Sequence, residues 1–189
     1  MELPMKMIVY WSMKTSNCII CIVVLFLSFS FGCGSEEVFN EIGNHKDGEK
    51  HGKWISYCKH DQKIEEGNYK DGEKHGKWIS YFEDGQIWHE GNYKDGKEHG
   101  EFIYFGYGNY NILHKVKSEG YKDGKLNGKI IHFHVNGEKN SIVNYKDGEK
   151  NGKNIFYDKD GNIYWSGNFQ DGVLIDGGFI KSDKPFDLY

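Results

Sequence analysis

A nine-residue segment, KDGEKHGKW, constrains the fold of this chain more than any other feature. It occupies Lys46–Trp54 and recurs unchanged at Lys70–Trp78. Altered copies begin at Lys94, Lys122, Lys146 and Gln170, so successive starts are separated by 24, 24, 28, 24 and 24 residues. Self-similarity at a fixed period is typical of repeat architectures, in which each repeat packs against its neighbours. The sequence therefore predicts a repeat array over residues 38–178, followed by a C-terminal cap or tail at residues 179–189.

Each repeat contains two short strand-forming segments separated by turn signals. In the second repeat these segments are Lys77–Phe82 and Gln86–Tyr93, followed by the Asp-Gly pairs of residues 84–85 and 95–96. Asp-Gly is favoured in tight hairpin turns, where the backbone needs positive φ. No 3.6-residue apolar period is present after the N-terminal segment, so we predict no helix there. The expected fold is all-β, an elongated single-layer antiparallel β-meander of roughly 11 strands, built from about 24-residue β-hairpin repeats.

Alignment of the repeats predicts which side chains share a face, because residues two apart on a strand point the same way. We assign the better-packed face to an Ile column (Ile55, Ile79, Ile103, Ile131, Ile155) and a Tyr/Phe column (Tyr57, Tyr81, Phe105, Phe133, Tyr157). The opposite, looser face carries Trp54, Trp78, Phe102, Ile130 and Asn154. A third aromatic column closes each second strand: Tyr69, Tyr93, Tyr121, Tyr145 and Phe169. The third repeat has four extra residues, and because this number is even the faces are expected to stay in register.

The first 32 residues have the features of an export signal. Residues 18–31 carry no charge, and these 14 residues are fewer than the ~20 that a membrane-spanning helix needs. The stretch from Met13 is already a complete signal, so we favour translation from Met13. The signal ends Ser30-Phe31-Gly32-Cys33, which resembles the lipobox of bacterial lipoproteins, although Ser30 and Phe31 depart from the usual Leu and small residue.

This resemblance implies a signal peptide at residues 1–32, a lipidated Cys33 with a short linker at residues 33–37, and a membrane-anchored lipoprotein of the bacterial cell envelope. The alternative is an ordinary cleaved signal that leaves Cys33 unmodified. Cys18 and Cys21 would leave with the signal, so we expect no intrachain disulfide framework. Cys58 stands where Phe82 stands one repeat later, which favours a packed small hydrophobe over a reactive thiol.

The recurring Y-K-D-G-E-K-H-G-K-W resembles MORN repeats, specifically the bacterial MORN variant with the spacing G-x-Y-x-x-G-x-x-x-G-x-W. The resemblance covers about Val38 to Gly178 and implies a single-layer meander sheet that mediates protein or membrane contacts and carries no chemistry. Some bacterial proteins of this kind are labelled antitoxins. This chain departs from the pattern in its four-residue insertion, in Val143 where Gly67 and Gly91 stand in other repeats, and in the loss of Trp after the second repeat.

The charged residues argue against nucleic-acid binding. All 24 basic residues are Lys, and removal of residues 1–32 leaves 22 Lys against 27 Asp and Glu, a net charge of 22 − 27 = −5. Nucleic-acid binding needs concentrated positive charge and favours the bidentate contacts of Arg. We therefore expect no nucleic-acid partner.

The histidines do not predict a metal site. His51, His75 and His99 precede Gly in one column where later repeats have Asn127 and Asn151, which indicates tolerance of left-handed backbone at a turn. His132 and His134 have the spacing of some metal ligands, but no acidic or Cys ligand matches them, and we favour a solvated outer face. No nucleophile elbow, phosphate loop or catalytic carboxylate pair is present. We expect no enzyme, no cofactor and no metal.

Three functional hypotheses remain open. The first is a membrane-anchored, non-catalytic repeat module that mediates protein or envelope interactions, with an interaction face formed by Trp54, Trp78, Phe102 and Ile130. The second is an antitoxin or immunity-type protein that neutralises a toxin. The third is cell-wall or carbohydrate binding through the aromatic columns. A structural interpretation competes with all three, in which these aromatic residues only pack against each other on a thin sheet.

Overall fold

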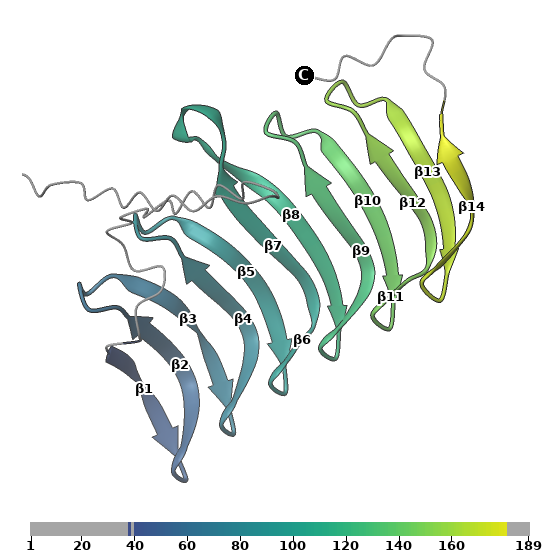
Figure 1. Ribbon diagram of the computed structural model, residues 1–189. Coiled ribbons are helices and arrows are strands. Elements are labelled where there is room, and N and C mark those ends of the chain that lie inside the picture. Colours follow the sequence, from purple (N-terminus) through teal and green to yellow (C-terminus); the bar gives the residue numbers. More distant parts are fainter. Residues whose placement is uncertain (1–37, 39, 181–189) are drawn as a thin grey trace, which may run out of the picture. The chain divides into compact units, whose positions relative to one another are not determined.

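The computed structural model describes residue 38 and residues 40–180, and the predicted signal, Cys33 and residues 181–189 lie outside them. The described residues form one open antiparallel sheet whose curved strands lie side by side in chain order (Figure 1). The strands are β1 (Asn40–Lys46), β2 (Glu49–Tyr57), β3 (Lys63–Lys70), β4 (Glu73–Tyr81), β5 (Ile87–Lys94), β6 (Lys97–Glu98), β7 (Gly100–Tyr107), β8 (Leu113–Lys122), β9 (Lys125–Phe133), β10 (Lys139–Lys146), β11 (Glu149–Lys150), β12 (Gly152–Tyr157), β13 (Ile163–Gln170) and β14 (Val173–Phe179).

The sheet confirms the predicted all-β meander. Within the described residues 14 strands are present, of which 12 form the path from β1 to β14, while the two-residue strands β6 and β11 pair with β5 and β10. Both short strands are separated from the next strand by one residue, His99 or Asn151, and they raise the count from 12 to 14, against the expected 11 or so. The four-residue insertion lengthens the β7–β8 hairpin, whose loop contains the 3-10 turn η2 (Asn109–Asn111). No helix within the described residues has both the length and the apolar character needed to cross a membrane.

The Asp-Gly pairs form the tight turns that the sequence predicts. At Asp71 and Gly72 φ is 50° and 78°, and the other five pairs of the repeat have positive φ at both residues. A two-residue loop with two positive φ values is a type I′ turn, whose twist matches that of the flanking strands. Successive turns are also joined, because the Gly72 amide donates to the Lys50 carbonyl at 3.1 Å and the later repeats form the equivalent bond. The turns thus close each hairpin and link it to the previous one.

The predicted assignment of the two faces is wrong. The column expected on the looser face is the buried one, and we call it the Trp row: Trp54, Trp78, Phe102, Ile130 and Asn154 are 5%, 4%, 2%, 7% and 1% exposed. The Ile and Tyr/Phe columns, expected to be better packed, are all only half-buried. Phe102 and Ile130 lie on opposite sides of the insertion and are both buried, so the even insertion did preserve the faces, as predicted.

Glycine on the neighbouring strand explains how an indole ring is buried on a single layer. A Cβ atom on Gly67 would overlap the ring of Trp78, and a Cβ on Gly91 would overlap that of Phe102. Each ring therefore lies directly on a neighbouring backbone that carries no side chain. The Trp78 Nε1 also donates to the Asn68 carbonyl at 3.0 Å, and the Lys74 ammonium lies 3.9 Å from the ring centroid. Backbone below and a cation–π contact above exclude water from the ring.

The third aromatic column completes this core. Rings from the Trp row alternate with His45, Tyr69, Tyr93 and Tyr121 along the first three repeats. Neighbouring centroids are 5.1 to 6.3 Å apart with interplanar angles of 70° to 86°. This edge-to-face geometry is the one that aromatic quadrupoles favour. One continuous row of rings therefore provides the packing that a second layer provides in a sandwich.

Candidate functional site

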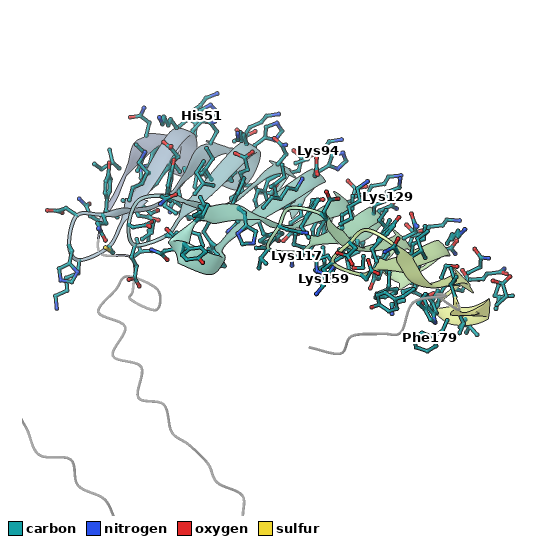
Figure 2. All side chains as sticks on the ribbon, turned by 90° about the horizontal axis from the view of Figure 1, so that it is seen from above. His51, Lys94, Lys117, Lys129, Lys159 and Phe179 are labelled. Atoms are coloured by element: carbon teal, nitrogen blue, oxygen red, sulfur yellow. The ribbon has the colours of Figure 1, made fainter. Side chains whose placement is uncertain are left out.

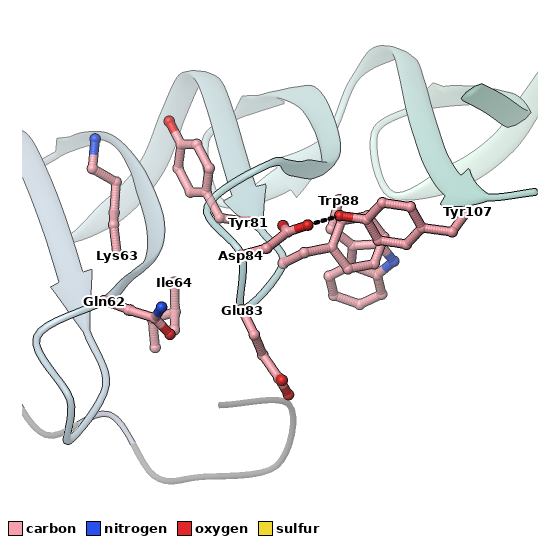
Figure 3. Close-up of a pocket in the computed structure, with 9 residues that line it drawn as sticks. Gln62, Lys63, Ile64, Tyr81, Glu83, Asp84, Trp88 and Tyr107 are labelled. Carbon is pink, nitrogen blue, oxygen red and sulfur yellow. Dashed lines mark hydrogen bonds between the residues drawn. The ribbon is translucent and has the colours of Figure 1, made fainter. Parts of the chain in front are cut away.

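A pocket of about 380 Å³ lies at the edge of the sheet opposite the type I′ turns (Figure 3). Three consecutive hairpins form it, through the β2–β3 loop with the start of β3, the β4–β5 loop with the start of β5, and the end of β7. We call it the aromatic pocket, and its lining residues are Gln62, Lys63, Ile64, Tyr81, Phe82, Glu83, Asp84, Trp88 and Tyr107. This volume is within the range of small-molecule sites.

The aromatic side chains of the pocket form a packed platform. The ring centroids of Phe82 and Tyr107 are 5.1 Å apart, and those of Phe82 and Trp88 are 6.5 Å apart. Trp88 is 47% exposed, whereas Trp54 and Trp78, the tryptophans of the Trp row, are buried. A large indole with one open face, supported by two further rings, can stack against a flat ligand.

Asp84 and Tyr107 place a fixed charge beside this platform. The Tyr107 hydroxyl donates to the Asp84 carboxylate, as Figure 3 shows, and the backbone amide of Gln86 donates to the same carboxylate at 3.0 Å. The bond from Tyr107 lowers the pKa of Asp84, while the same bond raises the pKa of Tyr107 to about 12. At neutral pH Asp84 is therefore charged and Tyr107 is protonated, so their bond is maintained.

The opposite side of the pocket is held by an ion-pair cluster around Glu66. The Glu66 carboxylate accepts a hydrogen bond from Tyr81 and lies 3.2 Å from the ammonium groups of both Lys53 and Lys63. These donors, Tyr81 first, hold the pKa of Glu66 at about 2. The Lys63 ammonium is also 5.1 Å from the Tyr81 ring centroid. Lys63 is therefore fixed at the pocket edge, where its charge is balanced by Glu66.

The residues predicted as an interaction face are not part of this pocket. Trp54, Trp78, Phe102 and Ile130 all lie in the Trp row, where they are at least 93% buried. They cannot present contact area to a partner unless the sheet opens. The constancy of a column therefore does not predict its burial, because the ring that lies on each glycine decides which face is buried.

Two signals in the sequence mark the aromatic pocket. Trp88 stands in a column where the preceding repeat has Ile64 and the next has Val116, so the fold does not require an aromatic residue there. Tyr107 exists only because the four-residue insertion extends β7 two residues beyond Phe105, the equivalent of Tyr81. Trp88 and Tyr107, which depart from the repeat, therefore join residues of the repeat such as Tyr81 to form the pocket.

The His column has a different role from the predicted one. His51, His75 and His99 have no left-handed backbone, and the positive φ belongs to the Gly that follows each of them. Instead, each imidazole Nδ1 lies near an Asp Oδ1 of the next type I′ turn, at 3.8 Å for His51 and Asp71, and at 3.5 and 3.3 Å in the next two repeats. Each of these histidines therefore lies beside the next turn, but its Nδ1 forms no hydrogen bond within the described residues.

His132 and His134 have separate partners. His132 Nδ1 lies 3.1 Å from Ser141 Oγ, while His134 Nε2 lies 3.1 Å from the Tyr157 carbonyl oxygen. His132 is exposed, in line with the favoured solvated face. Among the described residues no group of three or more His, Cys, Asp or Glu side chains is arranged to hold a metal ion.

Cys58 corrects the prediction that no intrachain disulfide forms. It is fully buried, as expected of a packed small residue, but it is disulfide-bonded. The other cysteines of the chain, Cys18, Cys21 and Cys33, lie outside the described residues. If the signal is removed before Cys33, only Cys33 remains to pair with Cys58. A thioether lipid on Cys33 and a disulfide between these two residues exclude each other.

A second pocket of about 330 Å³ lies near the C-terminal end of the sheet, which Phe179 marks in Figure 2. Its lining is also aromatic, with Phe156, Trp165 and Phe169 among its residues. Its lining includes no carboxylate side chain. The Asn154 Oδ1 in this lining already accepts a hydrogen bond from the backbone amide of Asn144 at 2.7 Å. The aromatic pocket is therefore the better equipped of the two for a polar ligand.

Comparison with known proteins finds no family model that matches the chain and no curated protein that matches it. The geometry of the sheet and of the aromatic pocket therefore carries the functional argument.

Proposed function

We propose that this protein is a membrane-anchored, non-catalytic binding module of the bacterial cell envelope, and that the aromatic pocket is its binding site. The membrane anchor is the lipid expected on Cys33, on the strength of the lipobox-like sequence before it, and it requires that Cys33 is not the disulfide partner of Cys58. The repeat sheet is the scaffold. The pairing of β3 with β4 and of β5 with β7 places three hairpin ends side by side, where they form the pocket.

The exposure of Trp88 carries this proposal. An indole that is 47% exposed beside two other rings leaves roughly 100 Å² of mainly apolar surface in contact with water, since a Trp side chain buries up to about 250 Å². Covering this surface with a ligand would contribute about 2 kcal/mol of binding free energy.

The ionisable groups of the pocket support a binding role over catalysis. A general acid or base works best when its pKa is near the working pH. Here the pKa of Asp84 is lowered by the Tyr107 hydrogen bond, and that of Tyr107 is raised to about 12. Both groups therefore keep one protonation state across the neutral range, which suits fixed polar contacts.

Site-specific photo-crosslinking in cells tests the proposal. A photoreactive residue at Gln62 should give a discrete adduct in the envelope fraction, and the adduct should disappear in a Trp88→Ala variant. Tyr110→Ala is the matched control variant and should keep the adduct. Tyr110 is an exposed aromatic residue in the β7–β8 loop and does not line the pocket. No adduct from Gln62, or an equal adduct in Trp88→Ala, would contradict the proposed site. Digestion with protease or with glycosidase then shows whether the adduct is protein or glycan.

A further inference from the structure

The aromatic pocket combines a stacking surface with both donors and acceptors of hydrogen bonds. Trp88, Phe82 and Tyr107 provide the rings, Lys63 provides a donor, and Asp84 provides an acceptor. Gln62 adds an amide that can donate and accept. A ligand that matches this set must have one apolar face and a rim of groups that both donate and accept.

A pyranose ring has this combination. Its axial C–H groups form a weakly positive face, which the negative face of an aromatic ring attracts, and its hydroxyl groups donate and accept in the plane of the ring. The open face of Trp88 offers the ring, and the polar residues stand at the rim. The volume of about 380 Å³ leaves room for one or two such rings.

A cationic ligand fits this pocket less well. Aromatic cages hold a cation between rings that surround an empty centre. Here Phe82 and Tyr107 pack directly on each other, with centroids 5.1 Å apart. The Tyr81 ring already has the Lys63 ammonium at 5.1 Å. The protein itself therefore occupies these two places, and the open face of Trp88 is a flat surface rather than a cage.

An acidic sugar also fits less well. Lys63 is the one cation of the lining, and its charge is balanced by Glu66 at 3.2 Å. Glu83 and Asp84 are both acidic and line the pocket. A carboxylate on the ligand would be repelled by these groups without gaining an unpaired cation.

We infer that the aromatic pocket binds a neutral pyranose, stacked on Trp88 with its hydroxyl groups toward Gln62, Lys63 and Asp84. This inference rests on the proposed function, because it assigns a ligand class to the same pocket. It differs from carbohydrate binding through the repeated aromatic columns, since the Trp row is buried. The ligand source is either an envelope polysaccharide or a free oligosaccharide with the same ring chemistry.

Titration calorimetry on the full chain in detergent tests the ligand class, with chitotriose and maltotriose as neutral probes and trigalacturonate as the acidic probe. We expect at least one neutral trisaccharide to bind with a Kd of about 1 mM or lower, and trigalacturonate to bind at least about tenfold more weakly. Trp88→Ala should weaken binding of the neutral probe about tenfold or more, while Trp88→Phe should retain part of it, as expected for loss of one stacking ring. Tyr110→Ala should leave binding unchanged. Trp165→Ala, which changes the second pocket, should also leave binding unchanged.

Several results would overturn the inference. The first is the absence of binding heat with both neutral probes when each is present at 10 times the expected Kd. The second is tighter binding of trigalacturonate than of the neutral probes. The third is a loss of binding in Trp165→Ala instead of in Trp88→Ala. If these occur while the Gln62 crosslink still depends on Trp88, the proposed function stands and only the ligand class is wrong. Co-sedimentation with insoluble cell-wall polysaccharide separates the two sources. Trp88-dependent sedimentation supports a polymer, and trisaccharide binding without sedimentation supports a free sugar.

Discussion

Replacement of Gly67 by Ala tests whether the ring-on-glycine contact holds the sheet together. The added Cβ would overlap the Trp78 ring, which is 4% exposed and must then move outward. Overpacking of this kind costs about 1 to 3 kcal/mol. Displacement also weakens the 3.0 Å bond from Trp78 Nε1 to the Asn68 carbonyl, worth about 1 kcal/mol. Because Ala gains about 0.5 to 1 kcal/mol over Gly within a strand, we expect a net loss of about 2 kcal/mol in the free energy of unfolding.

Urea denaturation of the full chain, followed by tryptophan fluorescence, measures this loss. Gly178→Ala is the matched control, because Gly178 lies in strand β14 and has no atom within 4 Å of an added Cβ. We expect the control to gain up to about 1 kcal/mol, because Ala replaces Gly in a strand without a clash. Equal stability of Gly67→Ala and the wild type would refute the ring-on-glycine explanation of the buried face.

The chain also contains a natural compensating pair for this contact. Gly67 precedes Trp78 by 11 residues, and in the fifth repeat the same two positions hold Val143 and Asn154. Gly67→Val combined with Trp78→Asn should therefore be less destabilising than the sum of the two single changes, by at least about 1 kcal/mol. Additive effects would show that the two positions do not act as a pair.

Three further predictions concern pH, turns and the anchor. Because the pKa of Glu66 is lowered from its ordinary value of 4.5 to about 2, its stabilising effect is present above pH 4.5 and is lost as pH falls toward 2. Tyr81→Phe, which removes the principal donor, should reduce the loss of stability over this interval in urea titrations, and an unchanged pH profile would disprove that role. Gly72→Ala should cost about 1 kcal/mol in the same assay, since φ is +78° there, and a neutral effect would contradict the type I′ assignment. Metabolic labelling with a lipid precursor should mark the wild type and not Cys33→Ala, whereas a Cys33–Cys58 disulfide peptide in the membrane fraction would rule out the anchor.

The sequence predicts most of the fold because the repeat provides several independent signals. The period defines the hairpins, and the Asp-Gly pairs define one turn of each hairpin with the φ values that type I′ geometry requires. The even insertion after Phe105 keeps the alternation of faces, and burial on both sides of it confirms this. These are local or periodic properties, which one sequence is sufficient to reveal.

The identity of the buried face is not a local property. Both faces of β2 carry apolar residues, Ile55 on one and Trp54 on the other, so alternation alone does not rank them. The deciding contact joins a ring to a glycine 11 residues earlier on a neighbouring strand. A comparison of the repeats contains this signal, because Gly precedes an aromatic residue at this distance in the first three repeats, and both positions change together in the fourth and fifth.

The same comparison separates packing changes from functional ones. Where Gly becomes Val143, the ring at the paired position becomes Asn154, whose carbonyl accepts the Asn144 amide at 2.7 Å and leaves the side chain 1% exposed. That double change restores a filled core and needs no ligand to explain it. Trp88 shows the opposite behaviour, because it replaces a smaller apolar residue and remains 47% exposed beside Tyr107, a residue that only the insertion provides. Its exposed ring is therefore the surface that the proposed ligand would cover.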